Sequence, residues 1–393
     1  MTEVFILSAV RTPIGRFGGS LAGYSAAELG AQAAHAAWKR AGVAAEAIEL
    51  CIFGNARQAG GGPNPARQIV RLAGLPDEVP GYTINQACAS GLKAVEAAAL
   101  EIRLGRAACI VAGGTEAMSR IPYLAPRARW GQRMGHTPMV DAMYQDGYHC
   151  PLCDLLMGET AELLAGAYGI SRREQDEFAL ASHQKAAQAA AAGLGDELIA
   201  VEGSAGKLKV DEHVRPKARL EDFEGLEPAF KPAGSITAGN ASGITDGAAA
   251  LVLASGDFRQ RHALPVMGRW LESATAALAP ERMGLGPAPA IARLLRHFDG
   301  EGARLDHFDS IEINEAFAAQ VLACLREPEL SGLPRERLNP GGGAIALGHP
   351  TGCSGARILV TLLHTLRRRG GGRGLAALCA AGGMGMAAAV EVR

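Results

Sequence analysis

The sequence predicts an α/β protein built from two similar halves. Short apolar runs of strand length, such as Val4 to Leu7 and Cys109 to Ala112, alternate with segments whose apolar residues recur at helical spacing, such as Leu92 to Ile102. This alternation predicts helices packed on a mostly parallel sheet. Internal repetition is the second observation, and it predicts a tandem duplication at roughly domain length.

The repeat is visible in the order of short motifs. The first half reads Ile52-Phe-Gly-Asn55, then Cys88-Ala-Ser90-Gly91, then Val111-Ala-Gly113-Gly114. The second half reads Ile311-Glu-Ile-Asn314, then Cys353-Ser354-Gly355, then Ala381-Gly382-Gly383. In sheets of this kind the functional crevice lies at the carboxyl ends of the strands, where helices begin. Cys88 and His349 both precede repeat-equivalent helices, so pseudo-twofold packing of the halves would bring them together.

The first half carries a long insertion that has no counterpart in the second. It lies between Gly114 and Gly247 and contains Ser171-Arg-Arg-Glu174, a capping box that predicts a helix burying Phe178. An insertion in a duplicated core is where a substrate lid or oligomer contacts are expected. The insertion also supplies cations for a phosphate-bearing ligand, unless they form only a solvated basic loop: Arg120, Arg127, Arg129, Arg133 and Arg215.

Length and charge limit the possible functions. With 393 residues the chain is long enough for two or more domains, and its net charge of −1 gives no global attraction to nucleic acid or an anionic membrane. An acidic residue, Glu3, stands where a signal peptide would be positively charged, and the uncharged stretch Gly374 to Val390 is interrupted by glycines. We therefore expect a soluble cytoplasmic protein that spans no membrane.

The cysteines do not form a disulfide framework. Eight of them are spread over the chain without the dense spacing of a small secreted scaffold. The run His149-Cys150-Pro-Leu-Cys153 resembles half of a zinc or redox site, but a structural zinc site needs four ligands and no second pair exists. We therefore predict no metal site.

His349 stands in a glycine-dense loop directly ahead of an apolar helix. Pro350 biases His349 toward an extended conformation, and we expect the helix to begin near Ser354. The imidazole would then lie over the positive end of that helix, where developing negative charge is favoured. The alternative is a glycine-rich turn that carries an incidental histidine.

Cys88 follows the strand-like run Tyr82-Thr-Ile and precedes a helix whose field should lower its pKa, which is typical of a nucleophilic thiol. The alternative for Cys88 is a small buried apolar side chain. Cys379 is a second thiol at a predicted strand end. Asn314 follows another strand and is a candidate oxyanion donor, although a helix cap is the simpler reading of that residue alone.

Together these motifs resemble the thiolase family, the acetyl-CoA acetyltransferases and their 3-ketoacyl-CoA relatives. The four ordered motifs are Cys88-Ala-Ser-Gly, Asn314-Glu-Ala-Phe, the box running from Gly348-His349-Pro350 to Arg357, and Cys379 ahead of Gly-Gly-Met-Gly. The resemblance implies two βαβαβαββ halves that form a layered α/β/α/β/α core. It also implies an N-terminal half at 1–264, which includes a lid or loop insertion at 115–246, and a C-terminal half at 265–393.

The resemblance also implies a reaction, a reversible Claisen condensation through an acyl-cysteine. Cys88 would take the acyl group while His349 accepts the thiol proton, and Cys379 would deprotonate the methyl group of a second acetyl-CoA. His349 and a water held by Asn314 would stabilise the enolate, and the backbone N–H groups of Cys88 and Ala381 would stabilise the other oxyanion.

The substrates implied by the resemblance are coenzyme A thioesters, with no permanently bound cofactor. Acyl-CoA and CoA would be the binding partners, and the chain would form a homodimer or homotetramer. Six residues correspond to family positions that contact coenzyme A or line the acyl pocket: Arg215, Ser242, Met157, Phe230, Met283 and Phe317.

Two positions depart from the family pattern. Ala381 replaces a glycine, and a left-handed backbone there would be strained by its Cβ. Leu156 replaces the histidine that many biosynthetic members carry before Met157-Gly, which weakens a strict preference for acetoacetyl-CoA. A longer-chain 3-ketoacyl-CoA thiolase of fatty-acid β-oxidation is thus one alternative function. An inactive acyl-CoA-binding protein is another, if Ala381 disrupts the oxyanion site.

Overall fold

The computed structural model describes residues 2–298 and 304–393. In the first half, strands and helices alternate and two strands close the unit, which is the expected βαβαβαββ order. Its elements are β1 (Val4–Arg11), α1 (Ala26–Ala41), β3 (Leu50–Gly54), α2 (Pro65–Leu72), β4 (Gly81–Ile84), α3 (Ser90–Arg103), β5 (Cys109–Ala117) and β12 (Thr245–Ser255).

The second half has the same order, except at its third strand. In place of that strand there is a single parallel bridge between Ile311 and Leu338. Its elements are β13 (Gly268–Ala277), α8 (Pro287–His297), β14 (Ser310–Ile313), α9 (Ala318–Cys324), α10 (Ala344–Leu347), α11 (Thr351–Arg368), β15 (Gly372–Ala380) and β16 (Met384–Val392). Among the described strands and α-helices outside the insertion, β2 (Gly15–Arg16) and α7 (Gly256–Arg261) are not part of the repeat.

The core strands form one continuous mixed sheet, in which the strands of the two halves are joined where β1 pairs with β13 over Val4 to Ile6. The prediction of a mostly parallel sheet is therefore wrong. The order is β14-β15-β16-β13-β1-β12-β5-β3-β4, and only the β14–β15, β3–β5 and β3–β4 pairs are parallel. A parallel pair needs a crossover connection, usually a helix. The last strand of each half follows the strand before it without such a helix packed on the sheet, so β12 and β16 run antiparallel to β5 and β15.

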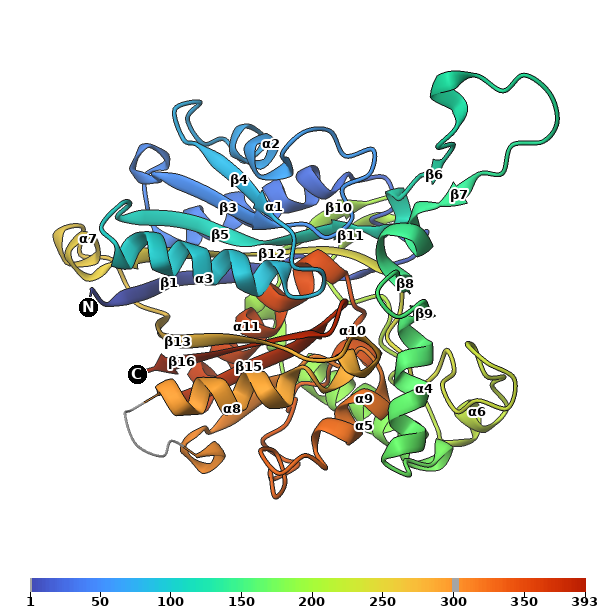
Figure 1. Cartoon of the computed structure of the whole chain (residues 1–393). Coiled ribbons are helices and arrows are strands. Elements are labelled where there is room, and N and C mark those ends of the chain that lie inside the picture. Colours follow the sequence, from blue (N-terminus) through green and yellow to red (C-terminus); the bar gives the residue numbers. More distant parts are fainter. Residues whose placement is uncertain (1, 299–303) are drawn as a thin grey trace.

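The layers follow the α/β/α/β/α arrangement (Figure 1). Helices α3 and α11 pack on each other in the middle, and α11 contacts β5 and β12 of the first half as well as β14 and β15 of the second. Helices α1 and α2 cover the outer side of the first half, and α8 covers β13 and β16 of the second. Separate apolar clusters fill the central layer and the two outer interfaces. The expected fold class is thus confirmed.

Two equivalent glycines let the central helices meet at their first turns. A Cβ on Gly91 of α3 would lie 2.8 Å from the backbone nitrogen of Ala356 in α11. A Cβ on Gly355 of α11 would lie 2.5 Å from the backbone nitrogen of Leu92 in α3. Real Cβ atoms do not approach backbone this closely, so the repeated Ser-Gly pair places the two helix starts, and the loops ahead of them, side by side.

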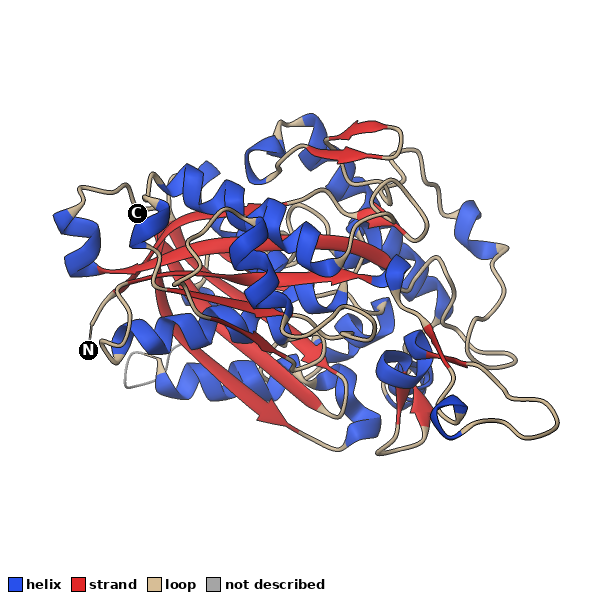
Figure 2. Ribbon diagram, turned by 90° about the horizontal axis from the view of Figure 1, so that it is seen from above, coloured by secondary structure: helices blue, strands red, loops and turns tan. Residues whose placement is uncertain are grey.

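The insertion folds into short strand pairs and helices beside the core (Figure 2). The predicted capping box at Ser171 is confirmed at the start of α5, but Phe178 is only half-buried. None of the described helices combines the length and apolar character needed to cross a bilayer. The insertion comprises β6 (Tyr123–Leu124), β7 (Val140–Asp141), β8 (His149–Cys150), β9 (Leu155–Leu156), α4 (Met157–Ala167), α5 (Arg172–Ala191), β10 (Val201–Gly203), β11 (Gly206–Leu208) and α6 (Glu221–Glu224).

Candidate active site

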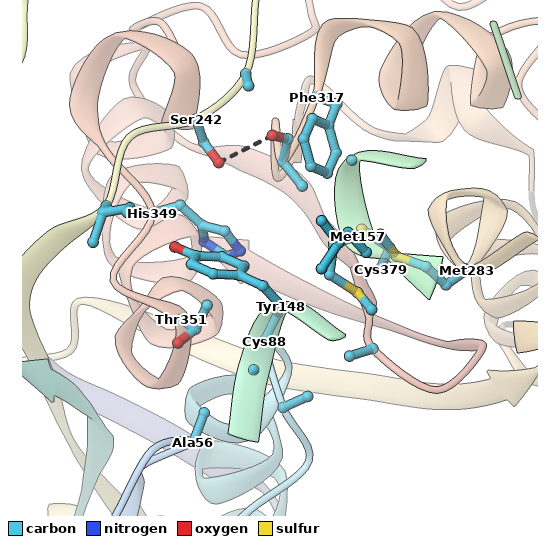
Figure 3. A pocket seen from close by; sticks show the side chains of 18 of the residues that line it. Ala56, Cys88, Tyr148, Met157, Ser242, Met283, Phe317, His349, Thr351 and Cys379 are labelled. Carbon is cyan, nitrogen blue, oxygen red and sulfur yellow. Dashed lines mark hydrogen bonds between the residues drawn. The ribbon is translucent and has the colours of Figure 1, made fainter. Parts of the chain in front are cut away.

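One cavity of about 240 Å³ lies where the two halves and the insertion meet (Figure 3). Three of the four predicted catalytic residues line it: Cys88 from the first half, and His349 and Cys379 from the second. Five of the six residues expected to bind coenzyme A or the acyl group line it as well: Ser242, Met157, Phe230, Met283 and Phe317. Residues far apart in sequence therefore share one site.

Cys88 stands in a tight turn between β4 and α3. Ala87, directly before it, has a φ of 48°, a left-handed conformation that is costly for a residue with a Cβ. Ser90 closes the turn, because its hydroxyl accepts from the backbone N–H of Gln86 at 2.9 Å and donates to the carbonyl of Ala87 at 2.6 Å. The strained turn holds the thiol on the cavity wall just ahead of the helix.

The expected lowering of the Cys88 pKa is wrong, because burial is the largest effect and raises it. The positive charge of Arg57 and the backbone N–H groups of Ala381 and Cys88 itself act in the opposite direction. The thiol is therefore the resting form, and a nucleophilic role would require a base that takes its proton.

His349 is held by a loop that only glycine permits. Gly348 has a φ of 110°, and a Cβ there would lie 2.5 Å from the Thr245 side chain. Helix α11 begins at Thr351 rather than near Ser354 as predicted, because Pro350 itself takes the N-cap position. The histidine therefore lies two residues before the first helical residue.

His349 is 7% exposed, and its ring lies close to the hydroxyl of Ser354. Ser354 Oγ donates to the carbonyl of Pro350 at 3.0 Å and lies 2.6 Å from His349 Nδ1. In this arrangement Nδ1 carries the ring proton and donates it to Oγ, so Nε2 keeps its lone pair. Nε2 has no partner among the described residues. Burial, Arg57 and Arg357 lower the pKa of His349 to about 3, so the ring is neutral and can accept a proton.

Cys379 is the second-last residue of β15 and is buried, and Ala381 begins the turn to β16. Burial, with Cys88 and Cys324 nearby, raises the pKa of Cys379 well above its usual value. The strain expected at Ala381 is absent: its φ is not positive, and the left-handed residues of the turn are Gly382 at 85° and Gly383 at 77°. The alanine thus leaves its N–H directed at Cys88.

Asn314 and Arg215 do not line the cavity. Asn314 is fully buried behind His349, with its Nδ2 3.5 Å from the ring Nδ1 and its Oδ1 3.5 Å from Arg357 Nη2. Arg215 is exposed, and its backbone N–H donates to His183. The four other arginines singled out in the insertion, Arg120, Arg127, Arg129 and Arg133, are likewise absent from the cavity wall.

The structure adds residues that the motifs did not reveal: Arg57, Tyr148 and Thr351 line the cavity, and Glu116 lies buried behind them. The sequence did contain one signal for Arg57. This residue stands two residues after Asn55, which occupies the position in the first half that Asn314 occupies in the second. Cys150 ends β8, and Cys153 lies in the turn between β8 and β9. Among the described residues, no group of three or more histidine, cysteine, aspartate or glutamate side chains could hold a metal ion.

Comparison with known proteins accords with this geometry. The family pattern described as thiolase, N-terminal domain, matches residues 4–257, and that described as thiolase, C-terminal domain, matches residues 264–392. An acetyl-CoA acetyltransferase of Cupriavidus necator is 48% identical over 397 residues, covering 100% of both chains. The solved acetyl-CoA acetyltransferase of Bacillus anthracis has a TM-score of 0.95 at 43% identity, covering 100% of this chain and 99% of the other. Human mitochondrial 3-ketoacyl-CoA thiolase, solved in complex with CoA, has a TM-score of 0.94 at 38% identity, covering 100% and 98%. The chain belongs to the thiolase family and is an acyltransferase.

Proposed function

We propose that this enzyme is an acetyl-CoA C-acetyltransferase, which condenses an acyl-CoA with acetyl-CoA and, in reverse, cleaves 3-ketoacyl-CoA with CoA. The observation that carries the proposal is the shared cavity of Cys88, His349 and Cys379. A nucleophile, a neutral base and a second thiol are the groups that an acyl-cysteine route to carbon–carbon bond formation requires.

In the first half-reaction Cys88 becomes acylated. His349 Nε2 takes the thiol proton, and the sulfur attacks the thioester carbonyl of acyl-CoA. The CoA thiolate then leaves as the new thioester forms. The imidazolium of His349 gives that proton to the departing thiolate, and Cys379 stays a thiol because burial raises its pKa. Acyl-Cys88, neutral His349, the Cys379 thiol and free CoA remain, so charge and protons balance.

In the second half-reaction His349 takes the proton of Cys379, and the resulting thiolate removes a proton from the methyl group of acetyl-CoA. The carbanion attacks the acyl carbon, Cys88 leaves as a thiolate, and the imidazolium of His349 returns its proton. We assign stabilisation of the enolate oxygen to His349 and a water held by Asn314, and that of the other oxyanion to the N–H groups of Cys88 and Ala381. The 3.5 Å approach of Asn314 to the ring supports its role beside His349.

Coenzyme A thioesters are the proposed substrates, and no permanently bound cofactor is part of the mechanism. Ser242 at the cavity, whose hydroxyl donates to the carbonyl of Ala316 at 3.0 Å, is a proposed contact for the coenzyme. We keep Arg215 as a proposed contact for its phosphates, outside the cavity itself. Four apolar side chains of the wall would contact the acyl and thioester end: Met157, Phe230, Met283 and Phe317.

We also propose a homodimer or homotetramer in the cytoplasm, with halves at 1–264 and 265–393. The hairpin of β6 and β7 supports self-association, because it extends away from the core and exposes Trp130 and Met134 by 87% and 93% (Figure 1).

Chain length is the main open alternative within the family. The apolar wall and Leu156 in place of histidine would also suit a longer-chain 3-ketoacyl-CoA thiolase. Rates of CoA-dependent cleavage for 3-ketoacyl-CoA of increasing length decide between them: the proposal expects the highest kcat/KM for acetoacetyl-CoA. An inactive acyl-CoA-binding protein is disfavoured by the unstrained backbone at Ala381.

The division of labour between the two thiols is tested by intact-mass spectrometry after mixing with acetyl-CoA. Cys88→Ala should gain no acetyl group, whereas Cys379→Ala should accumulate one acetyl group per chain and fail to condense it. Both variants remove one sulfur from the wall of the same cavity, so each controls for the other. Equal acetylation of the two variants would overturn the assignment.

A further inference from the structure

Arg57 is a buried cation on the wall of the catalytic cavity. It follows β3, and only 5% of the residue is exposed. A guanidinium is always charged and carries five N–H donors in a planar fork. Burying such a group is costly unless its donors and its charge are matched.

Within the described part of the chain, most of the Arg57 donors have no partner. Nη1 donates to Thr351 Oγ1, whereas the buried Nε has no acceptor. Among the described residues, no hydrogen bond from Nη2 and no carboxylate within 4.0 Å of this guanidinium is found. The side chain is therefore incompletely satisfied in the absence of a ligand.

Glu116, a buried carboxylate linked to Arg57 through the hydroxyl of Thr351, is engaged elsewhere. It accepts from Asn55 Nδ2, from the backbone N–H groups of Ala56, Arg57 and Gly352, and from Thr351 Oγ1. The hydroxyl of Thr351 thus lies between the Arg57 guanidinium and the Glu116 carboxylate. Arg57 lines the cavity, whereas Glu116 does not. The cation faces the cavity while its counter-charge does not.

The surroundings hold the guanidinium in place. It stacks on the ring of Tyr148, with 4.8 Å from its central carbon to the ring centre. Gly147 leaves room for it, since a Cβ there would overlap the guanidinium nitrogens. Much of the remaining wall is apolar, so a fixed, partly unpaired fork is available to a ligand with planar anionic oxygens.

We propose that Arg57 and Tyr148 form a subsite for a carboxylate at the far end of the acyl chain, so that the enzyme cleaves 3-ketoacyl-CoA substrates whose acyl group is ω-carboxylated. The inference rests on the proposed thiolase activity and specifies its substrate class. Cleavage of such a substrate gives acetyl-CoA and a carboxyacyl-CoA, with no added reactant beyond CoA.

The test compares kcat/KM for two six-carbon substrates, 3-ketohexanoyl-CoA and its ω-carboxylated counterpart. In the unchanged enzyme the carboxylated substrate should be preferred. Arg57→Met, similar in length but uncharged, should lower the ratio of carboxylated to uncharged kcat/KM at least about ten-fold. Arg57→Lys should lower it less, because the charge remains while the planar fork is lost. Arg261→Met, which removes an exposed arginine of α7 far from the cavity wall, should leave the ratio unchanged.

An equal loss of kcat/KM for both substrates in Arg57→Met would overturn the subsite. Arg57 would then affect only the reaction steps that the two substrates have in common. Should the Met variant fail to fold, the unchanged enzyme still decides: Cys88 should be acylated faster by succinyl-CoA than by butyryl-CoA in intact-mass time courses. Faster butyrylation would contradict the subsite while leaving the thiolase activity standing. Cleavage of neither six-carbon substrate nor acetoacetyl-CoA would instead refute the proposed function.

Discussion

The loops that carry Cys88 and His349 are equivalent in the repeat, and each is followed by a serine at the equivalent position. The two serines make different contacts. Ser90, at the start of α3, bonds the backbone of its own loop and fixes the strained turn of the nucleophile. Ser354, in the first turn of α11, lies 2.6 Å from the ring of His349 and sets its tautomer. The two equivalent strand–loop–helix segments therefore differ in their serine contacts, and in the proposed mechanism the first holds the nucleophile and the second holds the base.

Burial separates the two loops further. Cys88 is half-buried and reaches the cavity from a short turn, while His349 is almost fully enclosed. Enclosure disfavours the charged form of each group, so it raises the pKa of Cys88 and lowers that of His349. The neutral thiol–imidazole pair is the resting state, and charge develops only when substrate arrives.

Breaking the helix contact that joins the loops should have the largest structural effect. Gly355→Ala places a Cβ 2.5 Å from the backbone of Leu92, so α3 and α11 must separate. We expect the free energy of unfolding to fall by about 1–3 kcal/mol, as measured by urea titration. Gly225→Ala, where nothing lies within 4 Å, is the matched control. Equal stability of the two variants would show that the close approach is unimportant.

Removing each serine hydroxyl should separate the two roles. Ser354→Ala frees the His349 ring, so we expect the rate of Cys88 acylation to fall about ten-fold, a part of the general-base contribution. Ser90→Ala leaves the Gln86 N–H without an acceptor and should lower the free energy of unfolding by about 1 kcal/mol. Acylation at an unchanged rate in Ser354→Ala would show that this hydroxyl does not orient the base.

The buried histidines also predict how stability depends on pH. Burial lowers the pKa of His349 to about 3 and that of His183 to about 4, while both return to about 6.5 on unfolding. Between these values the unfolded chain binds more protons, so the free energy of unfolding should fall as pH drops below about 6.5, by up to about 1.4 kcal/mol per pH unit for each histidine. Urea titrations from pH 7 to 5 should show a shallower slope for His183→Asn.

The sequence predicted the features that follow from the internal repeat. It did not predict the features that depend on tertiary contacts. Motif order placed Cys88 and His349 at equivalent helix starts, and the structure confirms their convergence. The mostly parallel sheet was wrong, because periodicity does not show the direction in which the last strand of each half returns. The lowered pKa of Cys88 was wrong because burial, which no local pattern shows, outweighs nearby positive charge. Arg57 was missed because its role depends on Thr351, almost 300 residues away in sequence.

The central claim is that a thiol from one half and an imidazole from the other act on the same thioester. Its most direct test is the single-turnover rate of Cys88 acetylation by acetyl-CoA, followed by rapid-quench mass spectrometry in Cys379→Ala, where the acetyl group accumulates. Adding His349→Ala should slow this step by about 10²–10⁴-fold, the range of a general base. Acetylation at an undiminished rate in the double variant would contradict the account.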